Sequence, residues 1–307
     1  MGDSIEIWGR GSESHHLAVA NIPKIIDTNY TLSAHYNSEN PLFGKFGEHL
    51  LQPFNQVNSI FNGTAEELLQ KLNSHQIISF IGTRKVNSRE MGAVSHSIKT
   101  MANAGILDDQ MTATGLALGI DVAAARSSLD QNITTIGILP TGLDFMTPKQ
   151  NLIVALEAVK HGGILLSPYS QGQINGSDLA SSYPYWRRNQ LLAALSDVVV
   201  VGAADSKSGT FTTIQWAAFY GKPIIFIVGE NTPGQERYSD GAMKRFYKEY
   251  ILRRKPNNTN EPQHLQIPMN QIIGNNTNDP ITPLGVKAAI VNSTQNLGHI
   301  VPQILQP

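Results

Sequence analysis

The 307-residue chain contains no cysteine, and its other shortages narrow further what the protein can be. Without a thiol it has no disulfide, no thiolate metal site and no cysteine nucleophile. His15, His16 and His35 lack partners at metal-ligand spacing, so neither a metal nor another cofactor is expected. No apolar run approaches the roughly 20 residues that cross a bilayer, and residues 1–7 do not resemble a signal peptide. A cytoplasmic protein without membrane contact is the expectation.

Charge is also scarce. Lys, Arg, Asp and Glu make up 15% of the residues, and the net charge at pH 7 is −1. The usual charged fraction is about 25%. Such a chain has no global positive field that attracts nucleic acid, so any electrostatic attraction must come from a local patch.

From Gln76 onward, short β-branched runs alternate with amphipathic stretches, a pattern typical of βα units around a parallel sheet. The run Val198–Val201 is apolar at every position, as a strand covered on both faces requires. We therefore expect an α/β fold: a Rossmann-like, doubly wound, mainly parallel sheet with helices on both faces. The expected strands are 76–81, 111–113, 134–139, 164–167, 198–201 and 223–228, and the expected helices are 88–104, 119–129, 151–160, 187–195, 210–220 and 241–253.

The flanking segments are less regular. Residues 1–75 are expected to form a small, partly helical N-terminal extension, in which Thr64 and Glu67 make a capping box. Residues 76–255 make up the Rossmann-like domain. Residues 256–307 are expected to be a linker and C-terminal tail, because 255–281 are rich in Asn, Pro and Gln, with a last short helix near 284–291.

Three glycine-containing loops each follow an expected strand and precede a helix. The carboxyl ends of parallel strands share one edge of the sheet, so these loops should meet there. A helix amino terminus offers unpaired N–H groups and partial positive charge, and glycine lets an anion approach the backbone. For one loop alone, a tight βα connection is the simpler interpretation. Together the loops favour a phosphate or nucleic-acid site, whose expected residues are Gly82, Thr83, Arg84, Gly115, Gly119, Arg188, Asn189, Lys207, Ser208, Gly209 and Thr210.

Three further features each have two interpretations. Asp121, near a helix start, either caps that helix or has a catalytic role. Trp186 either stacks on a base at the ligand edge or packs in the core. The basic, aromatic stretch from Lys244 to Lys255 either holds a single strand or forms an amphipathic helix that buries Met243, Phe246, Tyr247 and Tyr250.

Five motifs follow one another along the chain, within residues 81–84, 114–126, 135–151, 183–196 and 208–213. Their central parts are Ile-Gly-Thr-Arg, Thr-Gly-Leu-Ala-Leu-Gly-Ile-Asp, Gly-Leu-Asp, Arg-Asn-Gln and Ser-Gly-Thr. In this order they resemble the DNA-processing protein A (DprA/Smf) family, within the wider Rossmann-like SLOG superfamily. The resemblance implies a homodimer that binds and protects single-stranded DNA and helps to load the RecA recombinase during DNA uptake, transformation and recombination. It implies no catalysis.

The chain departs from the family's motifs at three positions. Leu118 and Gln190 stand where the family has arginines, and Ala125 stands where it has histidine. Because affinity for DNA grows with the number of phosphate charges neutralised, the loss of two arginines should weaken binding and its salt dependence.

Two other functions stay open. The first is a sensor of a nucleotide-derived small molecule, for example in a defence system. A phosphoribohydrolase of the same superfamily would carry a catalytic Glu where this chain has Thr213, so an enzyme is not expected. The second is a scaffold that has lost its ligands.

Overall fold

The computed structural model describes residues 29–32, 57–63, 65–170, 172–174, 178–229, 238–251, 272–273, 288–292 and 297–305. Thr64 of the expected capping box, the three histidines considered as metal ligands and most of the expected linker at 255–281 lie outside these ranges.

A ten-stranded sheet runs through the molecule in the order β1-β2-β6-β5-β4-β3-β7-β8-β10-β9. The strands from β6 to β10 in this order pair in parallel, whereas β1, β2 and β9 pair antiparallel at the two ends. The expected α/β class with a mainly parallel sheet is thus confirmed. The strands are β1 Asn29–Leu32, β2 Val57–Phe61, β3 Gln76–Gly82, β4 Gln110–Thr114, β5 Thr135–Ile138, β6 Ile164–Ser167, β7 Val198–Ala203, β8 Ile224–Val228, β9 Ile272–Ile273 and β10 Ala288–Asn292.

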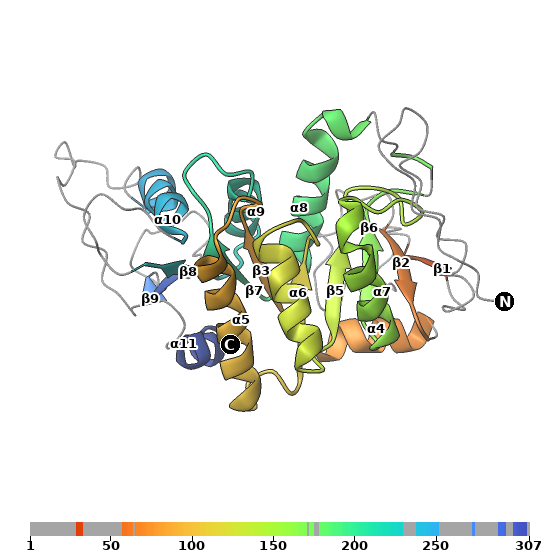
Figure 1. Cartoon of the computed structure of the whole chain (residues 1–307), viewed down its shortest axis with the longest axis horizontal. Coiled ribbons are helices and arrows are strands. Elements are labelled where there is room, and N and C mark those ends of the chain that lie inside the picture. The colour runs from red at the N-terminus through yellow and green to blue at the C-terminus, as the bar shows by residue number, and fades with distance from the viewer. Residues whose placement is uncertain are drawn as a thin grey trace.

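Helices cover both faces of the sheet (Figure 1). Side chains alternate along β7, so that Val199 and Val201 pack into one layer of core and Val198 and Val200 into the other. The first layer is covered by α4 Ala65–Ser74, α8 Tyr183–Leu195, α9 Phe211–Phe219 and α10 Asp240–Phe246, and the second by α5 Ser88–Asn103, α6 Ile120–Asp130, α7 Leu152–Lys160 and α11 Leu297–Leu305.

The strand order reverses beside β3. The chain places β4, β5 and β6 on one side of β3, then crosses over and places β7 and β8 on the other side. At such a switch point the connections after neighbouring strands diverge, and open α/β sheets bind their ligands in the crevice that results. The crevice is therefore expected between the loop after β3 and the loop after β7.

Several elements differ from the sequence-based expectation. The last helix is α11 Leu297–Leu305 instead of a helix near 284–291, and β9 lies within the expected linker. Residues 288–292 form β10, a strand parallel to β8, where a short helix was expected. In an apolar run this short, periodicity does not distinguish a buried strand from a helix. The segment forms a strand because it pairs with the edge of β8. The extension expected to be helical contains β2 as well as α4, and β2 pairs with β6. Helix α8 begins at Tyr183, four residues before the expected start, with Pro184 in its first turn.

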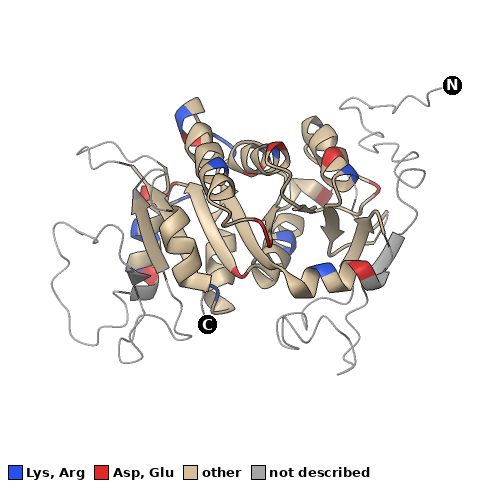
Figure 2. Cartoon of the chain, turned by 90° about the horizontal axis from the view of Figure 1, so that it is seen from below, with Lys and Arg blue, Asp and Glu red and all other residues tan. Residues whose placement is uncertain are grey.

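Charged residues of both signs are interspersed along the elements (Figure 2). Within the described ranges, none of the helices combines the length and the apolarity needed to cross a lipid bilayer.

Candidate phosphate-binding site

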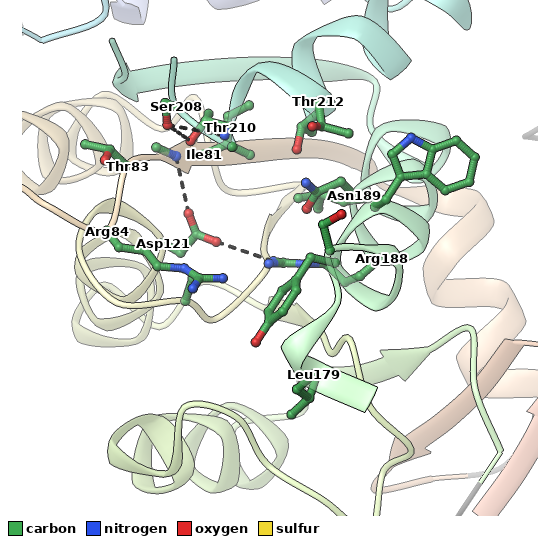
Figure 3. Close-up of a pocket in the computed structure, with 18 of the residues that line it drawn as sticks. Ile81, Thr83, Arg84, Asp121, Leu179, Arg188, Asn189, Ser208, Thr210 and Thr212 are labelled. Carbon is green, nitrogen blue, oxygen red and sulfur yellow. Dashed lines mark hydrogen bonds and ion pairs between the residues drawn. The ribbon is translucent and has the colours of Figure 1, made fainter. Parts of the chain in front are cut away.

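An open cavity of about 580 Å³ lies over the carboxyl ends of β3 and β7 (Figure 3). Its walls are the loop after β3, the start of α6, the segment 179–182 with the first half of α8, and the loop before α9 with the first turn of α9. Of the residues expected from the sequence, those that line it are Gly82, Thr83, Arg84, Arg188, Asn189, Ser208, Gly209 and Thr210. Gly115 and Gly119 lie behind the walls, and Lys207 is exposed on its loop without lining the cavity. Residues more than 120 positions apart thus meet at the switch point.

Asp121 joins two of the loops to α8. Its carboxylate accepts the N–H groups of Gly82 at 3.3 Å and Gly115 at 3.1 Å, and lies 3.6 Å from Arg188 Nη1. The side chains of Asp121 and Arg188 are each 6% exposed. The interpretation of Asp121 as a helix cap is wrong, because α6 begins after Gly119 without a side-chain cap and the carboxylate binds the neighbouring loops instead.

Two glycines permit this close packing. A Cβ on Gly115 would lie 1.0 Å from Arg188 Nη1, and a Cβ on Gly119 would lie 2.3 Å from the carbonyl oxygen of Thr83. Gly119 also has a φ of +81°, which side chains other than glycine rarely adopt. Both glycines therefore shape the cavity by letting its walls come together.

Two cations approach the cavity from different walls. Arg188 extends from α8, and Arg84 from the loop after β3 (Figure 3). The Arg84 guanidinium lies 4.8 Å from the centre of the Tyr185 ring. Burial lowers the pKa of Arg188, Asp121 opposes that change, and the positive charge of Arg84 lowers the pKa further. Burial also raises the pKa of Asp121, against the effect of Arg188 and of the backbone N–H groups that it accepts.

The ion pair does not satisfy Arg188 completely. Its Nε is buried and has no hydrogen-bond partner. A buried, unpaired donor on a charged group is costly, and it marks a place where an acceptor is missing. An anion between Arg84 and Arg188 would supply acceptors and relieve the repulsion between the two cations.

The loop before α9 forms the third wall. The Ser208 hydroxyl donates to Thr210 Oγ1 at 3.0 Å, and the Thr210 N–H donates to Ser208 Oγ at 3.3 Å. A Cβ on Gly209 would meet nothing within 4 Å, so the backbone there is open to an incoming group. The amino terminus of α9 adds partial positive charge. This end of the cavity is thus suited to a phosphate oxygen.

Arg245 of α10 supports this loop from outside. Its Nη1 donates to the Ser206 carbonyl at 2.9 Å, and its guanidinium lies 3.8 Å from the centre of the Phe211 ring. The sequence marked Arg245 only as part of a basic stretch. The packing interpretation of that stretch is confirmed for Met243 and Phe246, which are buried, whereas Tyr247 is only partly buried against the core. The Tyr250 side chain and residues 253–255 lie outside what the structure describes.

A family model described as "DNA recombination-mediator protein A" matches residues 67–249. Protein Smf of Escherichia coli is 27% identical over 226 residues, which are 68% of this chain and 57% of that protein. Among solved structures, DNA processing protein A of Helicobacter pylori matches with a TM-score of 0.52 at 23% identity. The matched region is 72% of this chain and 88% of the Helicobacter pylori chain. The protein of that name from Streptococcus pneumoniae matches with a TM-score of 0.53 at 21% identity. The matched region is 75% of this chain and 72% of the Streptococcus pneumoniae chain.

The chain belongs to the DNA recombination-mediator protein A family. Its match includes every strand of the parallel sheet except β10, together with all the loops that line the cavity. It spans about half the length of the curated relatives that it matches.

The positions at which this chain departs from the family's motifs lie away from the cavity lining. Ala125 is buried in the core between α6 and α7. Gln190 accepts from Arg187 and donates to the Tyr220 hydroxyl at 2.9 Å. Leu118 is partly exposed but is not part of the lining. Arg84 and Arg188, which face the cavity, are therefore kept, and the arginines replaced by Leu118 and Gln190 lie at positions outside its lining.

Tyr185 lines the cavity although the sequence did not indicate it, whereas Trp186 and Thr213 had been considered for other reasons. Tyr185 precedes the expected start of α8, and the sequence offered no reason to place its ring against Arg84. Trp186 was singled out, and it both lines the cavity and is partly exposed. Thr213, at the place of a hydrolase's glutamate, also lines the cavity. Among the described residues, no three His, Asp or Glu side chains cluster as metal ligands would.

Proposed function

We propose that this protein binds single-stranded DNA in recombination or DNA uptake, with backbone phosphates held between Arg84, Arg188 and the start of α9. The observation that carries the proposal is the buried Arg188 guanidinium, which has an unpaired Nε and a second cation beside it. Membership of the recombination-mediator family supports the same role. The Helicobacter pylori relative binds single-stranded DNA. Because the chain belongs to this family, we extend the proposal to a homodimer that helps to load a RecA-type recombinase onto the strand in the cytoplasm.

An unpaired strand fits the surroundings of this cavity better than a duplex does. The cations are local and the net charge of the chain is −1, so a long duplex would meet little complementary surface. Tyr185 and Trp186 line the same cavity, and aromatic rings stack on bases only where those bases are unpaired. A strand can place one or two phosphates in the cavity while its bases turn toward these rings.

Titration of a labelled single-stranded oligonucleotide, followed by fluorescence anisotropy, tests the proposal. Arg84→Ala should weaken binding at least tenfold, because a hydrogen bond to a charged group contributes about 1.5–3 kcal/mol. The matched control is Arg89→Ala, which removes an exposed arginine that does not line the cavity. Binding no tighter than micromolar at low salt, or equal losses in both variants, would refute the proposal.

A nucleotide-derived small molecule is the second candidate, since about 580 Å³ falls within the roughly 300–1,000 Å³ typical of small-molecule pockets. A thermal-shift screen with nucleotides and cyclic nucleotides tests it. A ligand at 100 times its dissociation constant stabilises the folded protein by about 2.7 kcal/mol. Stabilisation by a nucleotide, without binding of the oligonucleotide, would favour this function over the first.

A further inference from the structure

An aromatic surface lies next to the cavity, on the outer sides of α8 and α9. We call it the aromatic patch: Tyr183, Trp186, Trp216, Phe219 and Tyr220. The ring centres of neighbouring members are 4.8–5.9 Å apart, so the patch is continuous. Tyr183 and Phe219 are 58% and 62% exposed, and Trp186 is 38% exposed.

Hydrogen bonds hold the buried side of the patch in place. Gln190 Nε2 donates to the Tyr220 hydroxyl at 2.9 Å, and Arg187 Nη1 donates to Gln190 Oε1 at 3.0 Å. The Tyr220 ring in turn stacks on Trp216 at 5.7 Å. Gln190, which replaces an arginine of the family's motif, thus orders the patch instead of facing the cavity.

We propose that the aromatic patch carries the bases of the strand whose phosphates enter the cavity. This inference rests on the proposed function. Trp186 belongs both to the cavity lining and to the patch, so a strand that leaves the cavity over α8 meets the exposed rings without a break. Arg187 lies on the same stretch of α8, where its guanidinium donates to Gln190 beside the rings.

The composition of the patch also points to bases. Every member is aromatic, and every nucleobase offers a flat face that stacks on such rings regardless of its sequence. Of the other large hydrophobic side chains that are exposed in the described part of the chain, Ile153 lies on α7 and Leu118 in the loop before α6, outside the patch. A second copy of this chain is the competing occupant, but it would cover Trp186 at the rim of the cavity and hinder entry of the strand.

The test compares strands of two lengths. A strand of about 16 nucleotides can extend over the patch, whereas one of about 4 nucleotides fills little more than the cavity. The double variant Tyr183→Leu with Phe219→Leu keeps the surface apolar but removes its exposed rings. The double variant should bind the long strand about tenfold more weakly, which is the loss expected when stacking on one base is removed. It should bind the short strand as tightly as the wild type does.

Two controls accompany the double variant. Phe219→Tyr keeps a ring and should bind the long strand like the wild type. Ile153→Ala alters a side chain with the same 62% exposure on another helix and should also change nothing.

The outcomes separate the two proposals. A wild-type protein that binds neither strand refutes the proposed function and the patch with it. Binding of the long strand that depends on Arg84 but is equal in wild type and double variant overturns only the patch. A double variant with unchanged affinity and half the molecular mass in solution would show instead that the patch joins two copies of the chain, which also overturns the inference.

Discussion

Gly209 offers a way to alter the cavity without disturbing the protein around it. A Cβ there meets no atom within 4 Å, and the backbone does not have a positive φ. Gly209→Ala should therefore change the free energy of unfolding by less than about 1 kcal/mol. It should weaken strand binding about tenfold, because the methyl group occupies the place where a phosphate approaches the backbone.

Gly92→Ala is the matched control for this variant. Gly92 also has no atom within 4 Å of an added Cβ, but it lies in α5 and does not line the cavity. Anisotropy titrations and urea unfolding of both variants provide the comparison. If Gly209→Ala and Gly92→Ala bind the strand equally well, phosphate does not approach Gly209.

Asp121 and Arg188 should be coupled in stability. Asp121→Asn leaves the Arg188 guanidinium buried without its counter-charge, and breaking such a pair costs about 3–5 kcal/mol. In the double variant Asp121→Asn with Arg188→Met no charge remains buried, so its loss should be smaller than the sum of the single losses by about 0.5–3 kcal/mol. Urea unfolding of the four proteins measures this difference. Additive losses would show that the two groups do not stabilise each other.

Each member of this pair lies in a recognisable motif, but the sequence does not reveal that they meet. Asp121 and Arg188 are 67 positions apart, and the sheet topology brings α6 and α8 to the same cavity. The sequence did indicate Gly115 as important. The reason for glycine there, the approach of Arg188, is visible only in three dimensions.

At the scale of elements, α10 should stiffen the loop that opens the cavity. Arg245→Met removes the hydrogen bond to the Ser206 carbonyl and the guanidinium over Phe211. We expect strand binding to weaken several-fold, in line with the roughly 1 kcal/mol of a typical hydrogen bond. Backbone amides of residues 206–210 should exchange with solvent faster.

Lys99→Met provides the control for charge, because Lys99 is exposed on α5 and does not line the cavity. Hydrogen exchange by mass spectrometry, together with anisotropy titrations, distinguishes the two variants. Unchanged exchange at residues 206–210 in Arg245→Met would mean that α10 does not stiffen this loop.

The strands and helices of the parallel core follow from the sequence because β-branched runs and amphipathic stretches alternate there, separated by turn residues. The exceptions occur outside this alternation. The segment Tyr183–Trp186 has the proline and aromatic residues of a loop, yet Pro184 is well tolerated in the first turn of α8. The segment Ala288–Asn292 becomes a strand because it completes the edge of β8.

For the molecule as a whole, the weak net charge predicts a shallow salt dependence. Each phosphate neutralised by a protein cation contributes about 0.7 to the slope of log affinity against log salt for single strands. Arg84 and Arg188 together lead us to expect a slope of about −1.4 for a single strand. Arg84→Ala should reduce its magnitude by about 0.7, and Arg89→Ala should leave it unchanged. Titrations at several salt concentrations measure the slope, and a value several times steeper would mean that other cations bind the strand.

The sequence by itself determined the α/β class, the order of the core elements and the glycine loops, because periodicity and turn residues are local properties of the chain. Only the tertiary structure decided that the loops after β3 and β7 form one cavity, that Asp121 binds those loops rather than its own helix, and that the rings of α8 and α9 form a single surface. These features depend on contacts between residues far apart in the chain. Such contacts arise from the order in which the strands pair, and no local pattern specifies that order.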